Sequence, residues 1–351
     1  MNDNPAAWRA VATLYNALVT ALVVSLVTRR GTDIAREYVF RHFRRQHLEK
    51  FLPGVAKLGL ADQPHAVACA LYHYHSNALG GVKTEYFRAS DTKAWVRYPP
   101  PRWMWRGTAI AAIPHEVSAA MLHGWHGHNG VSLGNSRLGF VCTGMTVDGM
   151  PGLEGYYLEH DRELKAEERV RFAYGEETMP RFDASAAPRL AAASWPQGRL
   201  ERTRRRYAMD YVRTMLAVLE DLLGPAQARA ELGRVARLVG LQFHEDAARE
   251  LGSSAPDSAG EFATWLKAML EGQGEEVTLE SSSEAFVLAL PRWKLADGLG
   301  LQDLPNAFAA WNELWTGACA AHDRFLQLET TSTVANGALS ARWRVCGAPG
   351  Q

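Results

Sequence analysis

The sequence predicts an α+β fold made of two tandem repeats, each combining helices with a small antiparallel sheet. Three observations support this prediction. The tripeptide PRW at 101–103 recurs 190 positions later, at 291–293. Each copy follows an alternating apolar and polar run and precedes a helix that begins with proline. Each of these helices leads to a dipeptide typical of tight turns, Asp148-Gly149 or Asn336-Gly337. We expect the two repeats to form a pseudo-dimer within one chain.

The composition places the chain among soluble globular proteins. It has 351 residues, 47% of them hydrophobic, and a formal net charge of zero. A wholly disordered chain is excluded, and a general nucleic-acid binder is disfavoured because no excess of positive charge faces phosphate. The four cysteines are scattered and form no CxxC pair, which favours a reduced, cytoplasmic compartment.

The first predicted helix carries the most apolar stretch of the chain. Residues 10–27 lack a formal charge, which is at the lower limit for a membrane span. The corresponding segment of the second repeat carries Arg213, Glu220 and Asp221 within its apolar pattern. Because one copy tolerates charges, we expect no membrane insertion. We expect instead a buried helix at a domain or subunit interface, which makes it a candidate surface for a homodimer.

The remaining elements follow in the same order in both repeats. The runs at 84–98 and 275–290 predict β-hairpins with one buried face. The segments at 113–127 and 304–318 predict helices. Between the repeats, residues 173–205 are rich in Ala, Pro, Arg and Ser, which predicts a linker. The predicted boundaries are therefore 1–172 for repeat one, the expected active or ligand-binding domain, and 206–351 for repeat two, the expected supporting domain.

The second repeat also resembles a known family. Residues 275–346 contain the strand end LALPRW, the helix NAFAAWNELWTGACAAHDRF and the closing strand ARWRVCG with Cys346. In these features the segment resembles the L-2-amino-thiazoline-4-carboxylic acid hydrolase-like family, although Leu290 stands where members often have cysteine. The resemblance implies a tandem duplication of the wider vinyl-reductase-like ligand-binding fold, whose members dimerise and some of which bind small molecules. It also implies hydrolysis of cyclic amidines or thiazolines.

Histidine is distributed unevenly between the repeats. Seven of the 12 histidines fall between residues 65 and 128, all in repeat one. With the 190-residue offset, His123 corresponds to Glu313 and His126 to Thr316. A purely structural need would be shared by both copies, so this asymmetry predicts a functional site in repeat one. A single histidine is more often structural, and the prediction depends on the cluster as a whole.

The spacing of four histidines predicts a metal site. His123 and His126 are three residues apart on a helix, and two imidazoles so placed can bind one metal ion. His128 lies just past Gly124 and Gly127. His115 lies about three helical turns before His126, on the same face of the helix. Neutral imidazoles suit a divalent transition metal, with zinc or iron expected and haem as the alternative cofactor. Glu116 is the predicted general base or a fourth ligand.

A second polar stripe precedes the first hairpin. His65, Cys69 and His73 recur every four residues on an otherwise apolar helix. We expect His73 to move a proton as a catalytic residue beside Glu116. The predicted substrate pocket consists of Tyr72, His75, Trp125 and Cys142.

Together these patterns favour a metal-dependent hydrolase that acts on a small polar metabolite with a C=N or C–N bond. The alternative is a sensor that binds a small molecule or haem without catalysis. A third hypothesis is a non-catalytic partner subunit that uses the apolar first helix as its interface.

Overall fold

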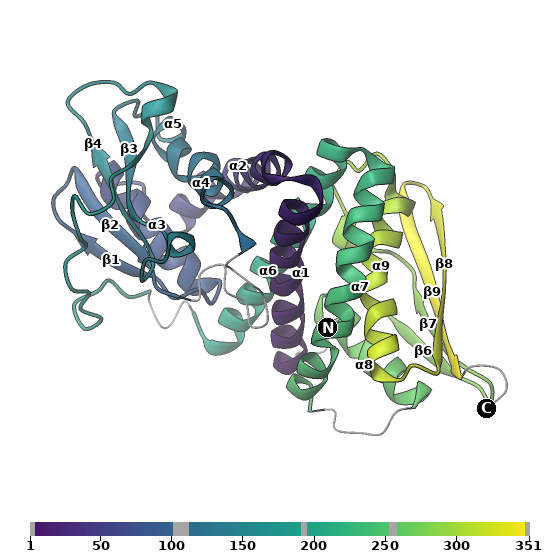
Figure 1. The fold of residues 1–351 in the computed structure, drawn as a ribbon. Helices are drawn as coiled ribbons and strands as arrows, with labels where there is room; N and C mark the ends of the chain where they lie inside the picture. Colours follow the sequence, from purple (N-terminus) through teal and green to yellow (C-terminus); the bar gives the residue numbers. More distant parts are fainter. Residues whose placement is uncertain (1–3, 101–111, 191–194, 253–257, 348–351) are drawn as a thin grey trace. The chain divides into compact units, whose positions relative to one another are not determined.

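The computed structural model describes residues 4–100, 112–190, 195–252 and 258–347. The chain divides into two compact units. Unit 1 consists of Met1–Ser25 and Glu201–Gln351, and unit 2 consists of Leu26–Leu200. Each unit packs helices on a mostly antiparallel sheet, which confirms the predicted α+β class (Figure 1). The first PRW tripeptide, with Trp103, lies outside the described residues.

Unit 2 builds a five-stranded sheet in the order β1-β2-β4-β3-β5. All neighbours are antiparallel except β3 and β5, which are parallel. The elements are α2 (Thr32–Lys57), α3 (His65–Leu79), β1 (Glu85–Arg88), β2 (Lys93–Tyr98), α4 (His115–Gly124), α5 (Asn129–Ser132), β3 (Leu138–Gly144), β4 (Leu153–Glu159) and β5 (Val170–Phe172).

Unit 1 builds a four-stranded antiparallel sheet in the order β6-β7-β9-β8. Helices α8 and α9 cover one face of this sheet (Figure 1). The elements are α1 (Pro5–Arg30), whose last residues belong to unit 2, α6 (Gln197–Leu223), α7 (Pro225–Glu250), α8 (Ala259–Gly272), β6 (Thr278–Ser281), β7 (Phe286–Leu290), α9 (Leu304–His322), β8 (Leu326–Ala335) and β9 (Ala338–Gly347).

The two repeats share one order of helices and strands, with the short helix α5 and strand β5 added in the first. The match extends to backbone angles. Gly31 separates α1 from α2 at φ 88° and ψ 164°, and Gly224 separates α6 from α7 at φ 78° and ψ 158°. Residues with a side chain rarely adopt a positive φ, so glycine suits this break in both copies. The duplication inferred from the sequence is therefore present in the topology.

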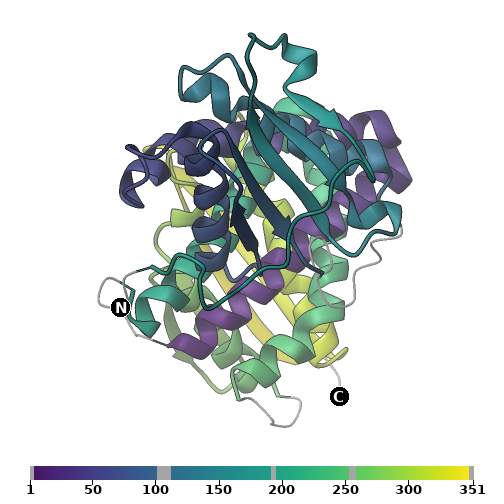
Figure 2. The ribbon, with the colours of Figure 1, turned by 90° about the vertical axis from the view of Figure 1, so that its left-hand side faces the viewer.

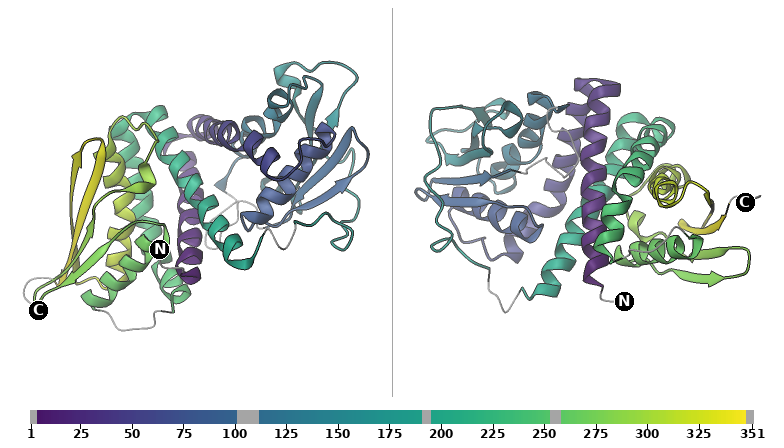
Figure 3. Two further views of the ribbon diagram at one scale, coloured as in Figure 1. Left: turned by 180° about the vertical axis from the view of Figure 1, so that it is seen from behind. Right: turned by 60° about the horizontal axis from the view of Figure 1, so that its bottom comes forward.

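Helix α1 packs into unit 1, so the compact units do not coincide with the repeats. It lies beside α6 (Figure 3), where Arg9 forms an ion pair with Glu201. The Tyr15 hydroxyl accepts a hydrogen bond from Trp311 Nε1 at 3.0 Å, and Ser25 donates to Glu231 at 2.8 Å. By length and composition α1 could cross a membrane, with a mean hydropathy of 2.0 over its most apolar window, yet 61% of that window is buried.

The predicted linker 173–205 has structure at both ends. Its last part belongs to α6, which begins at Gln197. Its first part, residues 173–182, crosses the sheet of unit 2 on the face opposite the helices (Figure 2), and we call it the strap. Ala173 and Met179 are buried there against an apolar patch made by Trp95, Val141 and Tyr156.

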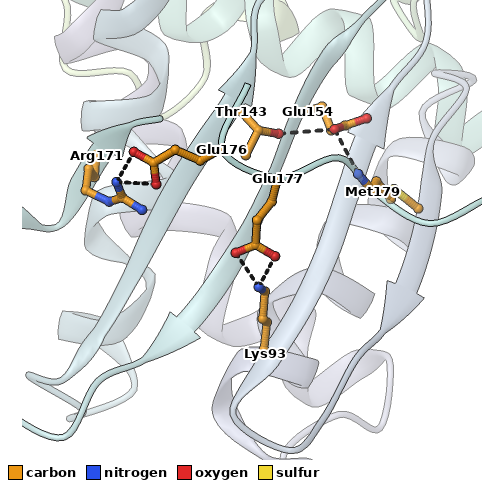
Figure 4. A network of polar contacts seen from close by, with 7 residues as sticks. All are labelled: Lys93, Thr143, Glu154, Arg171, Glu176, Glu177 and Met179. Atoms are coloured by element: carbon orange, nitrogen blue, oxygen red, sulfur yellow. Dashed lines mark hydrogen bonds and ion pairs between the residues drawn. The ribbon is translucent and has the colours of Figure 1, made fainter. Parts of the chain in front are cut away.

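Polar contacts fasten the strap to the strands beneath it (Figure 4). Lys93 Nζ lies 2.5 and 2.7 Å from the two carboxylate oxygens of Glu177. The backbone N–H of Met179 donates to Glu154 Oε1 at 3.0 Å. In unit 1 the corresponding sheet face carries charged side chains instead, such as the Arg344–Glu329 pair at 3.2 Å. A polar face needs no cover, whereas the apolar face of unit 2 is removed from water by the strap.

Candidate functional site

A groove of about 600 Å³ lies between α2 and α4 of unit 2, next to β5. The two helices pack closely because Gly124 has no side chain, and a Cβ there would lie only 2.6 Å from the Phe40 carbonyl oxygen. The volume is in the range of small-molecule sites. Its lining consists of Arg36, Glu37, Phe40, His115, Glu116, Ala119, Ala120, His123 and Phe172.

His115 is the first residue of α4, and the carboxylate of Asp148 holds its imidazole ring. Its Nδ1 lies 2.8 Å from Asp148 Oδ2, and the Tyr174 hydroxyl donates to the same oxygen at 2.9 Å. Asp148 ends a short turn closed by Gly149, which has a φ of 83°. With Nδ1–H donating to the carboxylate, Nε2 becomes the acceptor of the ring. This is the arrangement of an oriented general base.

His123 lies two turns further along α4. Both imidazoles face the Phe172 ring, whose centroid is 5.2 Å from that of His115 and 6.0 Å from that of His123. Burial lowers the pKa of His123 below its ordinary value, so this ring is neutral at pH 7 and offers an N–H donor without a charge. The groove also presents charges of both signs, from Arg36, Glu37 and Glu116.

The four predicted metal ligands do not gather at one point. Helix α4 ends at Gly124, so the expected spacing of His123 and His126 on one helical face is broken. His126, in the short helix His126–His128, faces the core, and His128 Nδ1 donates to the His123 carbonyl oxygen at 2.9 Å. Only His115 and His123 line the groove. Within the described ranges no three His, Cys, Asp or Glu side chains are grouped to hold a metal ion.

The predicted catalytic residues lie in different places. Glu116 lines the groove. His73 is buried in a polar network within the core, where Asn129 Nδ2 donates to His73 Nε2 at 3.3 Å and to the Tyr157 hydroxyl at 2.8 Å. The Tyr157 hydroxyl lies 2.7 Å from His126 Nδ1. His73 and His126 therefore come together with each other and not with Glu116.

The predicted substrate-pocket residues do not line the groove. The Tyr72 hydroxyl donates to the Lys50 carbonyl oxygen at 3.5 Å, and its ring stacks on Trp125 with centroids 6.2 Å apart. His75 is buried, which lowers its pKa. Burial in β3 raises the pKa of the Cys142 thiol to about 12, so a thiolate is not available there at neutral pH.

The residues of the predicted polar stripe on α3 lie in different surroundings, as the predicted catalytic residues do. His65 Nδ1 contacts Asn135 Nδ2 at 3.0 Å at the beginning of the helix. Cys69 is fully buried, and burial raises its pKa.

The sequence does not predict the other lining residues of the groove, which are Arg36, Glu37, Phe40, Ala119, Ala120 and Phe172, or Tyr174, which contacts Asp148 beside the groove. Phe172 and Tyr174 fall at the end of repeat one and in the predicted linker, where no pattern marks them. Arg36 does leave a signal, because the equivalent position after Gly224 is also arginine, Arg229. Asp148 was identified only as a turn residue, and its contact with His115 requires the fold.

The fold and groove thus define an α+β protein with an internal duplication and a polar surface site in one copy. Neither a protein-family model nor a curated protein matches the chain. The resemblance carried by residues 275–346 stays a prediction.

Proposed function

We propose that this protein is a hydrolase for a small polar metabolite with a C=N or C–N bond, and that the α2–α4 groove is its active site. The observation that carries the proposal is the His115–Asp148 contact of 2.8 Å at the groove. A carboxylate that fixes the orientation and tautomer of an imidazole is a recurrent way to make a general base. His115 is also one of the residues predicted from the histidine asymmetry.

The groove residues suggest the following steps for a C=N substrate. His115 Nε2 takes a proton from water while the water oxygen bonds to the carbon, and the C=N electron pair moves onto nitrogen. Asp148 stabilises the imidazolium that forms, which then returns the proton to the nitrogen. A further proton transfer lets the C–N bond break, giving a carbonyl compound and an amine. His123 donates a hydrogen bond to the polar group, and Glu116 binds a cationic amidine.

The predicted zinc or iron ion stays a prediction. His115, His123 and Glu116 line the same groove and are the residues that would hold it there. The steps above describe what the protein groups do, and an ion in the groove would add Lewis-acid chemistry to them. Metal analysis of the purified protein, and activity before and after chelation, test the ion separately from the general base.

The experiment is an activity screen with cyclic amidines, thiazoline carboxylates and simple amides, in which mass spectrometry detects the products. We expect His115→Ala and Asp148→Asn to lower kcat by 100-fold or more, in line with the loss of a general base. The matched control is His65→Ala, which removes an imidazole of the same unit outside the groove. Turnover that survives in both groove variants would overturn the proposal.

A small-molecule sensor without catalysis is the second candidate. It is favoured by a groove at the equivalent place in unit 1, which lacks imidazoles, so the fold forms this hollow irrespective of catalytic side chains. Saturable binding of the screened compounds without turnover would support the sensor. A Soret absorption band would support the haem alternative. Cytoplasmic location and a homodimer through α1 stay predictions.

A further inference from the structure

The groove of unit 1 lies between α7 and α9 and has a volume of about 290 Å³. Its position corresponds to that of the α2–α4 groove. Counting from Gly31 and Gly224, Arg229 corresponds to Arg36 and Gly233 to Phe40. Its lining differs in chemistry and consists of Ala226, Arg229, Ala230, Gly233, Arg234, Arg237, Ala309, Ala310 and Glu313.

The charged residues of this lining are mostly cationic. The lining contains three arginines and one carboxylate: Arg229, Arg234, Arg237 and Glu313. The floor is built from alanine and glycine, which leaves the hollow open between the arginines. The lining of the α2–α4 groove contains two phenylalanines and two histidines instead, with Phe40 at the position of Gly233 and His123 at that of Glu313.

The partners of these arginines leave positive charge available. Arg229 Nη1 donates to the neutral amide oxygen of Asn306 at 2.9 Å, and Asp303 fixes the other end of that amide through Asn306 Nδ2 at 2.7 Å. Arg237 contacts Glu313 at 3.1 Å, with side chains 52% and 35% exposed. Exposed ion pairs of this kind contribute little and rearrange readily.

Arg234 adds a third positive group. Its contact with Glu231 is long, at 3.7 Å, and Glu231 also accepts a hydrogen bond from Ser25. Guanidinium groups bind oxyanions through paired N–H donors, and several of them around one hollow favour a ligand with more than one negative charge.

We propose that the α7–α9 groove binds a small oxyanion with two or more negative charges, either a phosphate or a polycarboxylate. The duplication then gives one chain two grooves of different chemistry, one with imidazoles and one with arginines. This site is independent of the proposed hydrolase activity, because its residues lie in the other unit.

Titration calorimetry on the full chain tests the proposal. Inorganic phosphate and citrate are titrated separately at one ionic strength held with potassium chloride, so that chloride serves as the monovalent control. We expect saturable binding of at least one of the two. Binding of phosphate alone identifies a phosphorylated ligand, and binding of citrate alone identifies a polycarboxylate.

Two variants locate the site. Arg229→Gln removes a guanidinium from an exposed position, and we expect about tenfold weaker binding, the effect of one charge-assisted hydrogen bond. Gly233→Phe introduces the side chain that the other repeat carries at this position, and we expect the filled groove to lose binding. The control Arg249→Gln lies on the same helix outside the groove and should retain the affinity of the unchanged protein.

Three outcomes would overturn the proposal. One is that neither anion gives more heat than chloride. Another is that both groove variants bind as well as the unchanged protein. The third is that Arg36→Gln, in the α2–α4 groove, weakens binding while Arg229→Gln does not. Circular dichroism confirms that each variant is folded before titration.

Discussion

The imidazole rings of His73 and His126 are stacked in the core of unit 2, with centroids 4.1 Å apart and planes inclined by 10°. Asn129 and Tyr157 surround the pair with hydrogen bonds. In the second repeat, His126 corresponds to Thr316, and counting back from Gly81 and Gly274 places Leu266 at the position of His73. A buried polar network is therefore present in one copy of the duplicated fold, and its two histidines have no counterpart at the equivalent positions of the other.

The Tyr157 hydroxyl connects this network, and its removal should be costly. Tyr157→Phe leaves the buried Asn129 amide and the His126 ring each without one partner. We expect the free energy of unfolding to fall by about 1–3 kcal/mol, the cost of unsatisfied buried polar groups. Urea denaturation measures this change. Tyr86→Phe, on strand β1 outside the network, is the control and should cost less. Equal losses in the two variants would contradict the role assigned to Tyr157.

The close packing of α2 and α4 depends on Gly124. In Gly124→Ala the new Cβ would lie 2.6 Å from the Phe40 carbonyl oxygen, so one helix must move. We expect a loss of about 1–3 kcal/mol in unfolding free energy, as for other overpacked sites. Gly233→Ala is the matched control in unit 1, because its Cβ would meet nothing closer than 3.4 Å. Since alanine favours a helix over glycine, this control should be neutral or stabilising. A neutral Gly124→Ala would argue against the close approach.

His42 predicts a pH dependence of stability. Burial lowers its pKa to about 3, below the ordinary value of 6.5. Between these values the unfolded chain binds the extra proton, so the stability present above pH 6.5 is lost as the pH falls. Between pH 8 and pH 5 this one group accounts for about 2 kcal/mol.

The variant His42→Leu should therefore lose less stability on acidification than the unchanged protein. Urea denaturation at pH 8 and pH 5 gives the difference. Tyr38→Phe removes the hydroxyl that contacts His42 Nδ1 and keeps the imidazole, so most of the pH dependence should remain. An unchanged pH dependence in His42→Leu would show that other groups cause the acid sensitivity.

The strap is expected to be held by burial more than by charge. Met179→Ala removes an apolar side chain from the patch on the sheet, and we expect a loss of about 2 kcal/mol or more. Glu177→Gln breaks the ion pair with Lys93, in which the carboxylate side chain is 44% exposed, and should cost less than about 1 kcal/mol. Unfolding in urea compares the two. A larger loss of unfolding free energy in Glu177→Gln than in Met179→Ala would mean that the ion pair contributes more than burial to holding the strap.

Much of the fold followed from the sequence because duplication makes patterns visible twice. The glycine breaks, the proline-initiated helices and the turn dipeptides all lie at equivalent places in the two copies. The strap was not foreseen, since Ala173 and Met179 sit in a segment whose composition resembles a linker. The strap covers an apolar outer face to which three strands contribute, and that face exists only once the sheet has folded.

The site was foreseen in part. His115, Glu116 and His123 lie on one helix at spacings that place them along one groove, which periodicity can indicate. The sequence predicts His126 on the same helical face as His123, because it does not show that α4 ends at Gly124. Asp148 is 33 residues from His115, and nothing local to either residue reveals the contact.

The division of α1 between the units has a consequence for how the chain is made. Residues 26–200 form a continuous stretch, so unit 2 can fold while the ribosome is still at work. Helix α1 must wait for Trp311, the partner of Tyr15, which follows 296 residues later in the chain. During that interval α1 lacks its partners from the later part of unit 1, and its apolar side chains are accessible to chaperones.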